Sequence, residues 1–147
     1  MKLQKILLAV MAVVITASTV AFYRIPQPLV PENAEIKYVH MEIYRSTITD
    51  SEFVDVTDEI DLEAAAQVLR QHKRGRLPYF PQGGLTTDGM IWLDILVEEN
   101  GYSYFLHGII GMHNGRNNHV KIGANGPRLE ILNAADLQTE LTALLPN

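Results

Sequence analysis

Apolar and polar positions alternate most clearly between Ile91 and Ile131, where short apolar segments are separated by Asn-Gly pairs at 100–101, 114–115 and 125–126. Asn-Gly favours a two-residue type I′ turn, because both central residues of that turn need positive φ and its twist matches that of the flanking strands. Three such pairs predict an antiparallel meander. The pattern predicts a scaffold and carries no chemistry of its own.

A two-residue turn at Asn100-Gly101 sets the register of the first hairpin in this meander. Glu99 then faces Tyr102, and one face of the hairpin is apolar, with the pairs Val97–Tyr104, Ile95–Leu106, Leu93–Gly108 and Ile91–Ile110. The other face is mixed, with the pairs Glu98–Ser103, Leu96–Phe105, Asp94–His107 and Trp92–Ile109. The apolar face needs a helix or a second sheet to cover it.

Two segments have the composition of helices that could cover that face. Residues 62–73 are rich in good helix formers, with Asp61 placed as N-cap and Gly75 ending the helix. A closing helix is predicted for residues 134–145, with Asn133 as its cap.

The segment before the first helix predicts a leading hairpin. Residues 36–44 alternate between apolar and polar, and residues 52–57 form a second short strand. The predicted fold class is therefore α+β: an antiparallel β-meander sheet with two helices packed on one face, preceded by an N-terminal transmembrane or signal helix.

The N-terminus is the most hydrophobic part of the chain. Lys2 and Lys5 precede Ile6 to Phe22, a run without a charged residue that would reach roughly 26 Å as a helix. It predicts either an uncleaved membrane anchor or a cleaved signal peptide covering residues 1–23. Lysines on the N-terminal side keep that end in the cytoplasm. The following domain is thus expected outside the cytoplasm, as a single-pass membrane protein or secreted after cleavage.

The prolines that follow indicate a boundary. Pro26, Pro28 and Pro31 block helix continuation and favour extended chain, which predicts a spacer over residues 24–35. A proline-rich recognition motif is the alternative, but no PxxP with basic flanks is present. The domain itself is then expected to comprise residues 36–147.

Composition and charge narrow the function classes. The absence of cysteine excludes disulfides, thiolate metal sites and a cysteine nucleophile. A net charge of −5 argues against nucleic acid as a partner, because phosphate binding needs a basic face. The sequence carries no dinucleotide fingerprint, phosphate loop, HExxH motif or calcium loop. No cofactor is predicted.

Two neighbouring segments are candidates for binding. Arg74 and Arg76 belong to a basic cluster that could hold an anion, although basic residues are common at a helix C-terminus. Tyr79 and Phe80 lie in a proline-bounded loop, where exposed aromatic side chains would form a low-entropy binding edge. In the alternative interpretation, both aromatic residues plug the end of the core.

The histidines are the candidates for chemistry. His113 and His119 would face each other across a five-residue loop from Asn114 to Asn118, at a separation compatible with a shared metal ion. A two-residue turn at Asn114-Gly115 would instead send them to opposite faces. Solvent-exposed turn histidines without a metal are the ordinary alternative.

Asp94 opposite His107 is a second pair with chemical potential. A carboxylate can orient an imidazole for acid–base catalysis, yet cross-strand ion pairs are far commoner than catalytic dyads. Ser103 and Thr86 supply hydroxyls, but no motif places either of them within reach.

One resemblance extends over most of the chain. The segment Phe53-Val54-Asp55-Val56-Thr57-Asp58-Glu59-Ile60-Asp61 and the basic segment Lys73-Arg74-Gly75-Arg76 resemble those of small extracytoplasmic proteins of unknown function from Gram-positive bacteria. In these proteins a membrane segment or signal peptide precedes a strand, a turn of this type, a short helix, a hairpin meander and a C-terminal helix. The resemblance implies a domain without known activity and carries no catalytic residues.

Three functions follow as hypotheses. The first is a membrane-tethered, non-catalytic binding module for a protein or cell-envelope component, of which an immunity or inhibitor protein is a special case. The second is a small metal-dependent or His/Asp hydrolase that uses the residues Asp94, His107, His113 and His119. The third is a structural envelope protein without a specific ligand.

Overall fold

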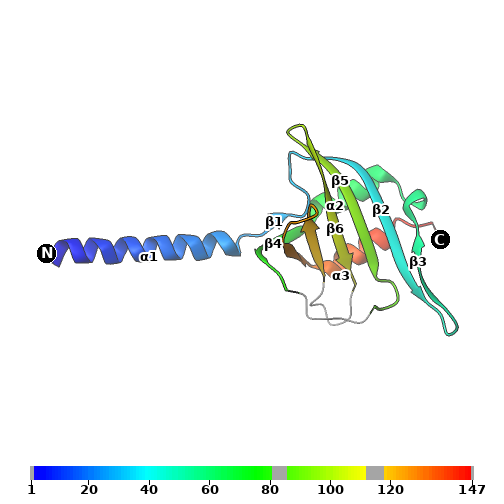
Figure 1. Cartoon of the computed structure of the whole chain (residues 1–147), viewed down its shortest axis with the longest axis horizontal. Coiled ribbons are helices and arrows are strands. Elements are labelled where there is room, and N and C mark those ends of the chain that lie inside the picture. The colour runs from blue at the N-terminus through cyan, green and yellow to red at the C-terminus, as the bar shows by residue number, and fades with distance from the viewer. Residues whose placement is uncertain (1, 81–85, 112–117, 147) are drawn as a thin grey trace.

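The computed structural model describes residues 2–80, 86–111 and 118–146 (Figure 1). Its helices are α1 (Lys2–Arg24), α2 (Leu62–Gln71) and α3 (Ala134–Thr142), with a 3-10 turn at Thr57–Glu59. Its strands are β1 (Gln27–Pro28), β2 (Glu35–Ser46), β3 (Ser51–Asp55), β4 (Lys73–Pro78), β5 (Ile91–Glu99), β6 (Tyr102–Ile110), β7 (His119–Ile122) and β8 (Arg128–Leu132). These strands form one antiparallel sheet in the order β1-β4-β8-β7-β6-β5-β2-β3.

The meander and the register of its first hairpin are confirmed. β5 and β6 pair residue for residue as predicted, from Glu99 opposite Tyr102 to Ile91 opposite Ile110. Asn100 and Gly101 have φ values of 52° and 80°, which are the positive angles that the type I′ turn requires. The local turn chemistry therefore determined which side chains share a face.

The other two Asn-Gly pairs behave differently. Asn114-Gly115 lies outside the described residues. At Asn125-Gly126 the predicted two-residue turn is wrong, because β7 ends at Ile122, β8 begins at Arg128, and the positive φ of 65° belongs to Gly123. Gly126 has another role: a Cβ there would clash with the backbone carbonyl of Ile122. Its glycine permits a close approach of two backbone segments.

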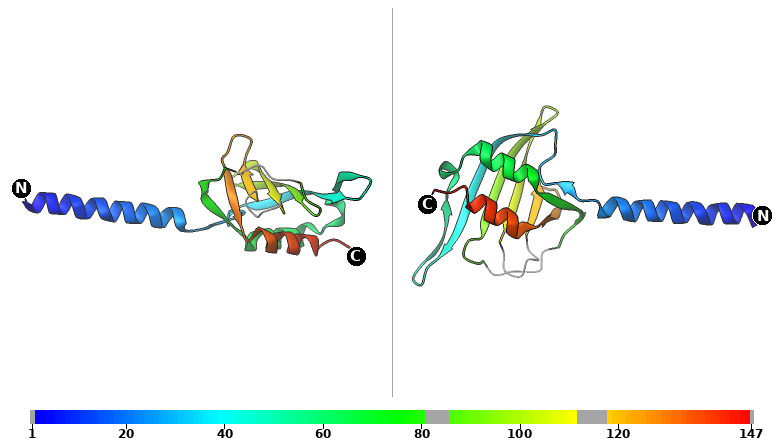
Figure 2. Two further views of the ribbon diagram at one scale, coloured as in Figure 1. Left: turned by 90° about the horizontal axis from the view of Figure 1, so that it is seen from below. Right: turned by 180° about the vertical axis from the view of Figure 1, so that it is seen from behind.

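Both α2 and α3 pack on the same face of the sheet, as predicted (Figure 2). Asp61 caps α2, since its side chain accepts a hydrogen bond of 2.7 Å from the Ala64 N–H. Leu69 of α2 and Leu137 and Leu141 of α3 are completely buried. They meet the apolar row of the sheet, which includes Met41, Ile91, Leu93, Ile95, Leu106 and Ile110.

The ends of both helices differ from the prediction. α2 stops at Gln71, and residues 73–78 form β4 along the edge of β8, so the basic cluster lies on a strand and not at a helix C-terminus. His72 turns the chain with extended backbone angles, φ −90° and ψ 160°. Asn133 occupies the predicted N-cap position of α3, but it is left-handed, φ 53°, and its side chain makes no capping hydrogen bond. Pairing with β8 outweighs helix propensity at residue 73.

The segment predicted as a spacer packs onto the domain. β1 pairs with β4, and the Leu29 N–H donates a hydrogen bond of 2.8 Å to the carbonyl of His72. Leu29, Val30 and Ala34 are buried in the core. The prolines do end α1, as expected, but they do not keep the following residues away from the sheet.

α1 is a single helix that extends away from the sheet at its β1–β4 edge (Figure 1). The candidate span is Leu3–Arg24, 22 residues long, and none of its side chains is buried against the domain. The helix is long and apolar enough to span a membrane or to act as a signal sequence.

Candidate functional site

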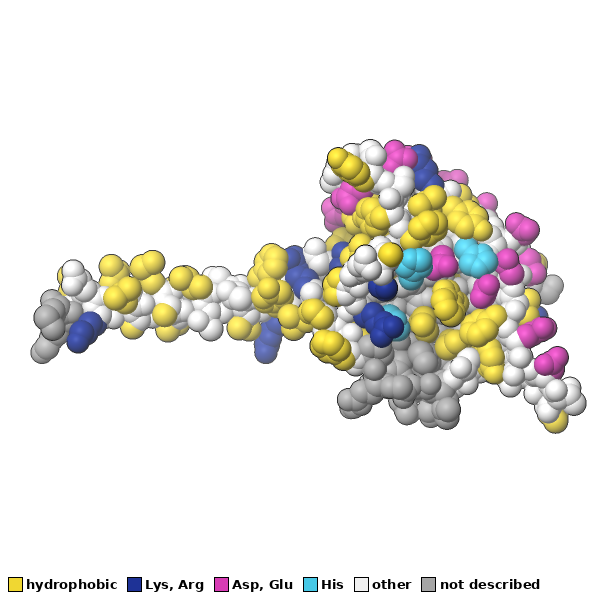
Figure 3. Space-filling model, in the orientation of Figure 1, with side chains coloured by type: hydrophobic (Ala, Val, Ile, Leu, Met, Phe, Trp, Pro, Cys, Tyr) yellow, Lys and Arg dark blue, Asp and Glu magenta, His cyan; other side chains and the backbone are white. Residues whose placement is uncertain are grey.

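The face of the sheet opposite α2 and α3 is not covered by any helix or strand of the described chain (Figures 2 and 3). Because side chains alternate along a strand, it carries the neighbours of the core residues. We call it the open face and define it by Tyr38, His40, Glu42, Tyr44, Phe53, Asp55, Trp92, Asp94, Leu96, Phe105, His107, Ile109, Lys121 and Arg128. Its aromatic residues are partly exposed, with 45% for Tyr38, 43% for Trp92 and 41% for Phe105.

A polar row crosses the open face through five strands. The register pairs His40 with Asp94, Asp94 with His107, His107 with Lys121 and Lys121 with Arg128. His107 Nδ1 donates to Asp94 Oδ1 over 2.6 Å, as the predicted hairpin register required. His107 Nε2 has no hydrogen-bond partner among residues 2–80, 86–111 and 118–146. Lys121 and Arg128 make the β8 end of the row basic.

The opposite end of the open face is acidic and tightly hydrogen-bonded. The Met41 N–H donates to Thr57 Oγ1 (3.1 Å), which lies 2.8 Å from His40 Nδ1, while His40 Nε2 lies 3.2 Å from Glu42. Hydrogen bonds from the Thr57 hydroxyl and backbone lower the pKa of Asp55, with a smaller contribution from His40. The lowered pKa keeps the Asp55 carboxylate ionised at neutral pH.

Aromatic side chains hold one another in place around this polar row. Phe53 makes edge contacts with Tyr44 and Trp92, with ring centroids 5.3 and 6.1 Å apart. Phe105 stacks on His107 at 5.8 Å. Figure 3 shows apolar side chains over this face, interrupted by histidine and acidic side chains, with further acidic side chains toward β2 and β3 and basic ones toward α1. The open face therefore carries aromatic side chains around the Asp94–His107 pair, with Glu42 and Asp55 toward β3 and with Lys121 and Arg128 toward β8.

The aromatic loop predicted from the sequence lies at the basic end. Tyr79 and Phe80 border a hollow of about 410 Å³ with Pro78, Lys121, Gly126, Pro127 and Arg128. The Tyr79 N–H donates to the Arg128 carbonyl over 2.6 Å. Phe80 is 84% exposed and does not plug the core. The structure thus joins this loop to the polar row.

Arg74 and Arg76 do not line that hollow. Arg74 is half-buried, and burial lowers the pKa of its guanidinium. Arg76 instead contacts α1: its Cζ lies 3.9 Å from the ring centroid of Phe22, and its Nε donates to the Ile25 carbonyl over 3.0 Å. Arg76 also lowers the pKa of Arg74, so the two guanidinium groups lie near each other, and the anion site stays a prediction.

The predicted metal pair stays a prediction. His113 lies outside the described residues, and His119 is buried on β7, opposite Ile109 and Glu130. Within the described part of the chain, no three His, Cys, Asp or Glu side chains are arranged to hold a metal ion.

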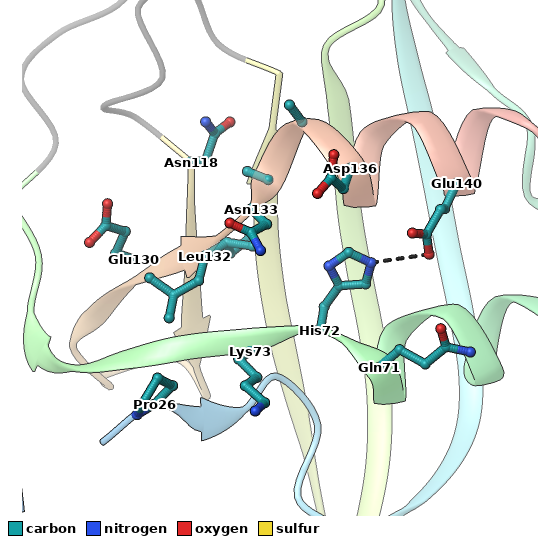
Figure 4. A pocket seen from close by; sticks show the side chains of 13 residues that line it. Pro26, Gln71, His72, Lys73, Asn118, Glu130, Leu132, Asn133, Asp136 and Glu140 are labelled. Carbon is teal, nitrogen blue, oxygen red and sulfur yellow. Dashed lines mark hydrogen bonds and ion pairs between the residues drawn. The ribbon is translucent and has the colours of Figure 1, made fainter. Parts of the chain in front are cut away.

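A second hollow, of about 840 Å³, lies on the other side of the molecule, where β8 leads into α3 (Figure 4). His72, only 8% exposed, bonds to Glu140 over 3.1 Å and thereby links the end of α2 to α3. Lys73, Asn133 and Asp136 also face this hollow. Sequence reasoning missed this pair because its members are 68 residues apart and no motif connects them.

Comparisons of the chain with protein-family models, curated proteins and solved structures find no match.

Proposed function

We propose that this protein is a non-catalytic binding module, anchored in the cytoplasmic membrane by α1, that binds a protein partner on its open face outside the cytoplasm. The observation that carries the proposal is the open face itself. Its aromatic residues are partly exposed and ordered by mutual contacts, and no described element covers them. Rigid aromatic side chains are the groups that most often dominate the binding energy of protein interfaces.

The properties of α1 support the proposed location of the domain outside the cytoplasm. α1 has the length and composition of a membrane-spanning helix, and Lys2 and Lys5 precede its apolar run. The positive-inside rule then places the sheet domain outside the cytoplasm. Cleavage of α1 as a signal peptide would leave the same domain secreted and the open face unchanged.

The charges of the open face define the chemistry of the partner. Lys121 and Arg128 occupy one end, and Glu42 and Asp55 occupy the other. A complementary protein surface carries apolar side chains between an acidic and a basic group, since complementary charges set orientation and speed association. We therefore expect a protein partner rather than a nucleic acid.

Photocrosslinking from the open face tests this proposal. A photoreactive residue at Phe105 in the full chain, in its native membrane, should capture one partner, and mass spectrometry should identify the attached peptide. The same residue at Gln67, which is exposed on the helix-covered side, is the control. The double variant Lys121→Glu, Arg128→Glu should weaken capture, whereas Arg45→Glu should not.

Three outcomes contradict the proposal. Equal adducts from Phe105 and Gln67 would show that capture is unspecific. An adduct of two copies of this chain would make the open face a self-association surface. Insensitivity to the Lys121 and Arg128 reversals would remove the charge argument.

A His/Asp hydrolase remains the second candidate because of one observation, the 2.6 Å bond between His107 and Asp94. This bond orients the imidazole and leaves Nε2 directed away from its partner, as a general base requires. Ser103 lies four residues along the same strand, about 13 Å away, too far to act as its nucleophile. Water would have to serve instead. Hydrolysis of ester or phosphoester probes that is lost in His107→Gln would favour this candidate over the binding module.

A further inference from the structure

The tip of β4 lies beside the end of α1, although the two segments are about fifty residues apart in the chain. Arg76 holds them together through its contact with the Phe22 ring at 3.9 Å and its hydrogen bond to the Ile25 carbonyl. All three ribbon views place β4 at the side of the domain from which α1 leaves (Figures 1 and 2). The domain is therefore in direct contact with the end of α1 through Arg76.

The residues after Arg76 are unusually apolar for an exposed strand end. Leu77 is 57% exposed and Phe80 is 84% exposed, and neither covers the core. Phe22, Tyr23 and Ile25, at the end of α1, are also about half exposed. Exposed apolar groups thus gather on both sides of the Arg76 contact, and such patches mark interaction surfaces.

The length of α1 places this cluster at a membrane boundary. The span Leu3–Arg24 is about 33 Å long as a helix, against roughly 30 Å for the hydrocarbon layer. Phe22 and Tyr23 then lie at the interface, where aromatic rings are enriched. Because Arg76 contacts Phe22, the C-terminal end of β4 lies at the same depth as Phe22. Phe80 follows four residues later, within about 13 Å of extended chain.

We propose that the tip of β4, by which we mean Arg76 and Leu77 at the end of the strand together with Phe80 directly after it, is a second membrane contact in which Leu77 and Phe80 insert among the lipid headgroups beside α1. The inference rests on the proposed membrane anchor and adds to it the orientation of the domain. The β1–β4 edge of the sheet faces the bilayer. In this orientation the open face does not lie against the bilayer, so a partner can reach it.

The absence of cysteine makes a direct test practicable, because single cysteines can be labelled without removing native ones. The full chain is reconstituted into vesicles of phosphatidylcholine and phosphatidylglycerol, and an environment-sensitive fluorophore is attached at Phe80→Cys. Quenching by lipids that carry a spin label near the headgroup reports membrane contact. Ile48→Cys is the matched control, since Ile48 is apolar and fully exposed at the β2–β3 turn.

Two further labels separate the contact from the anchor. Val14→Cys reports whether α1 enters the bilayer, and Tyr23→Cys reports the interface. We expect quenching at Phe80 comparable to that at Tyr23, and none at Ile48. Addition of Leu77→Glu should release the Phe80 label from the lipid while leaving the Val14 label in place.

The outcomes distinguish the two proposals. If Val14 is in the bilayer and Phe80 behaves like Ile48, the second contact is absent and the anchor stands. If the Phe80 label stays quenched despite Leu77→Glu, the fluorophore and not the tip causes insertion, which also overturns the inference. If Val14 is outside the bilayer, the anchor itself is wrong.

Discussion

The two faces of the sheet are built from alternate residues of the same strands, yet their side chains differ in kind. The side chains of Leu93, Ile95 and Leu106 lie beneath α2 and α3 and are at most 1% exposed. Their neighbours Asp94 and His107, on the open face, are hydrogen-bonded to each other, with side chains 28% and 39% exposed. One face therefore forms the core beneath the helices, whereas the other keeps polar and aromatic side chains partly exposed to solvent. Substitutions of adjacent residues should therefore have separate effects.

The largest expected effect is on the covered face. Leu106→Ala should lower the free energy of unfolding by about 2 to 5 kcal/mol, because it leaves a cavity in a fully buried site. Phe105→Ala, one residue earlier and on the open face, should cost less than about 1 kcal/mol. Urea denaturation of the full chain in detergent measures both. Equal losses would show that the open face also supports the fold.

The next effect concerns binding. Trp92→Ala should weaken affinity for the partner identified by crosslinking by about 2 kcal/mol, roughly thirtyfold in Kd, because Trp92 is a large, 43% exposed side chain of the open face that is held by its contact with Phe53. Tyr102→Ala is the control, since this aromatic residue is 77% exposed at the β5–β6 turn and outside the open face. Titration calorimetry measures both variants. A matching loss in the control would place the partner elsewhere.

A smaller effect is expected at the helix that covers the core. Asp61→Ala should destabilise the fold by about 1 kcal/mol, because the Ala64 N–H loses its capping partner. Asp61→Asn keeps an acceptor oxygen at the same place and should lose only a fraction of this. Thermal unfolding measures the pair. If Asn is as damaging as Ala, the carboxylate charge and not the cap stabilises α2.

The smallest effect is the pH dependence of stability that comes from Tyr104, which packs against the core. Burial and the bond to Glu99 raise the pKa of Tyr104 from 10.0 to about 12. The unfolded chain therefore loses this proton first, and the stability contributed by Tyr104 falls as the pH rises from 10 to 12. Tyr104→Phe should flatten this part of the alkaline denaturation curve. An unchanged slope would mean that other groups cause it.

Local signals predicted the parts of the fold that depend on neighbours in the chain. The β5–β6 register followed from Asn100-Gly101 and the α2 cap from Asp61, because each depends on atoms only a few residues apart. The register also brought Asp94 and His107 together correctly. Asn125-Gly126 does not form the predicted two-residue turn. Gly126 instead allows its backbone to approach the carbonyl of Ile122 closely.

Long-range pairings explain most of what was missed. The helix formers up to residue 73 gave no sign that the unpaired edge of β8 would take residues 73–78 as a strand. The prolines gave no sign that Leu29 and Val30 would be buried. His40 joined the candidate site only when β2 paired with β5.

The amino-acid pattern alone predicts the apolar N-terminal helix and the sheet with one apolar and one mixed face. It also predicts the two helices that cover the apolar face. Alternation and turn residues act over a few residues, so they can be read directly. Pairing across the whole sheet was needed to bring His40, Lys121 and Arg128 into one row with the predicted Asp94–His107 pair, and to bring β4 against Phe22. These contacts join distant residues, and they form only when the whole sheet buries its apolar face.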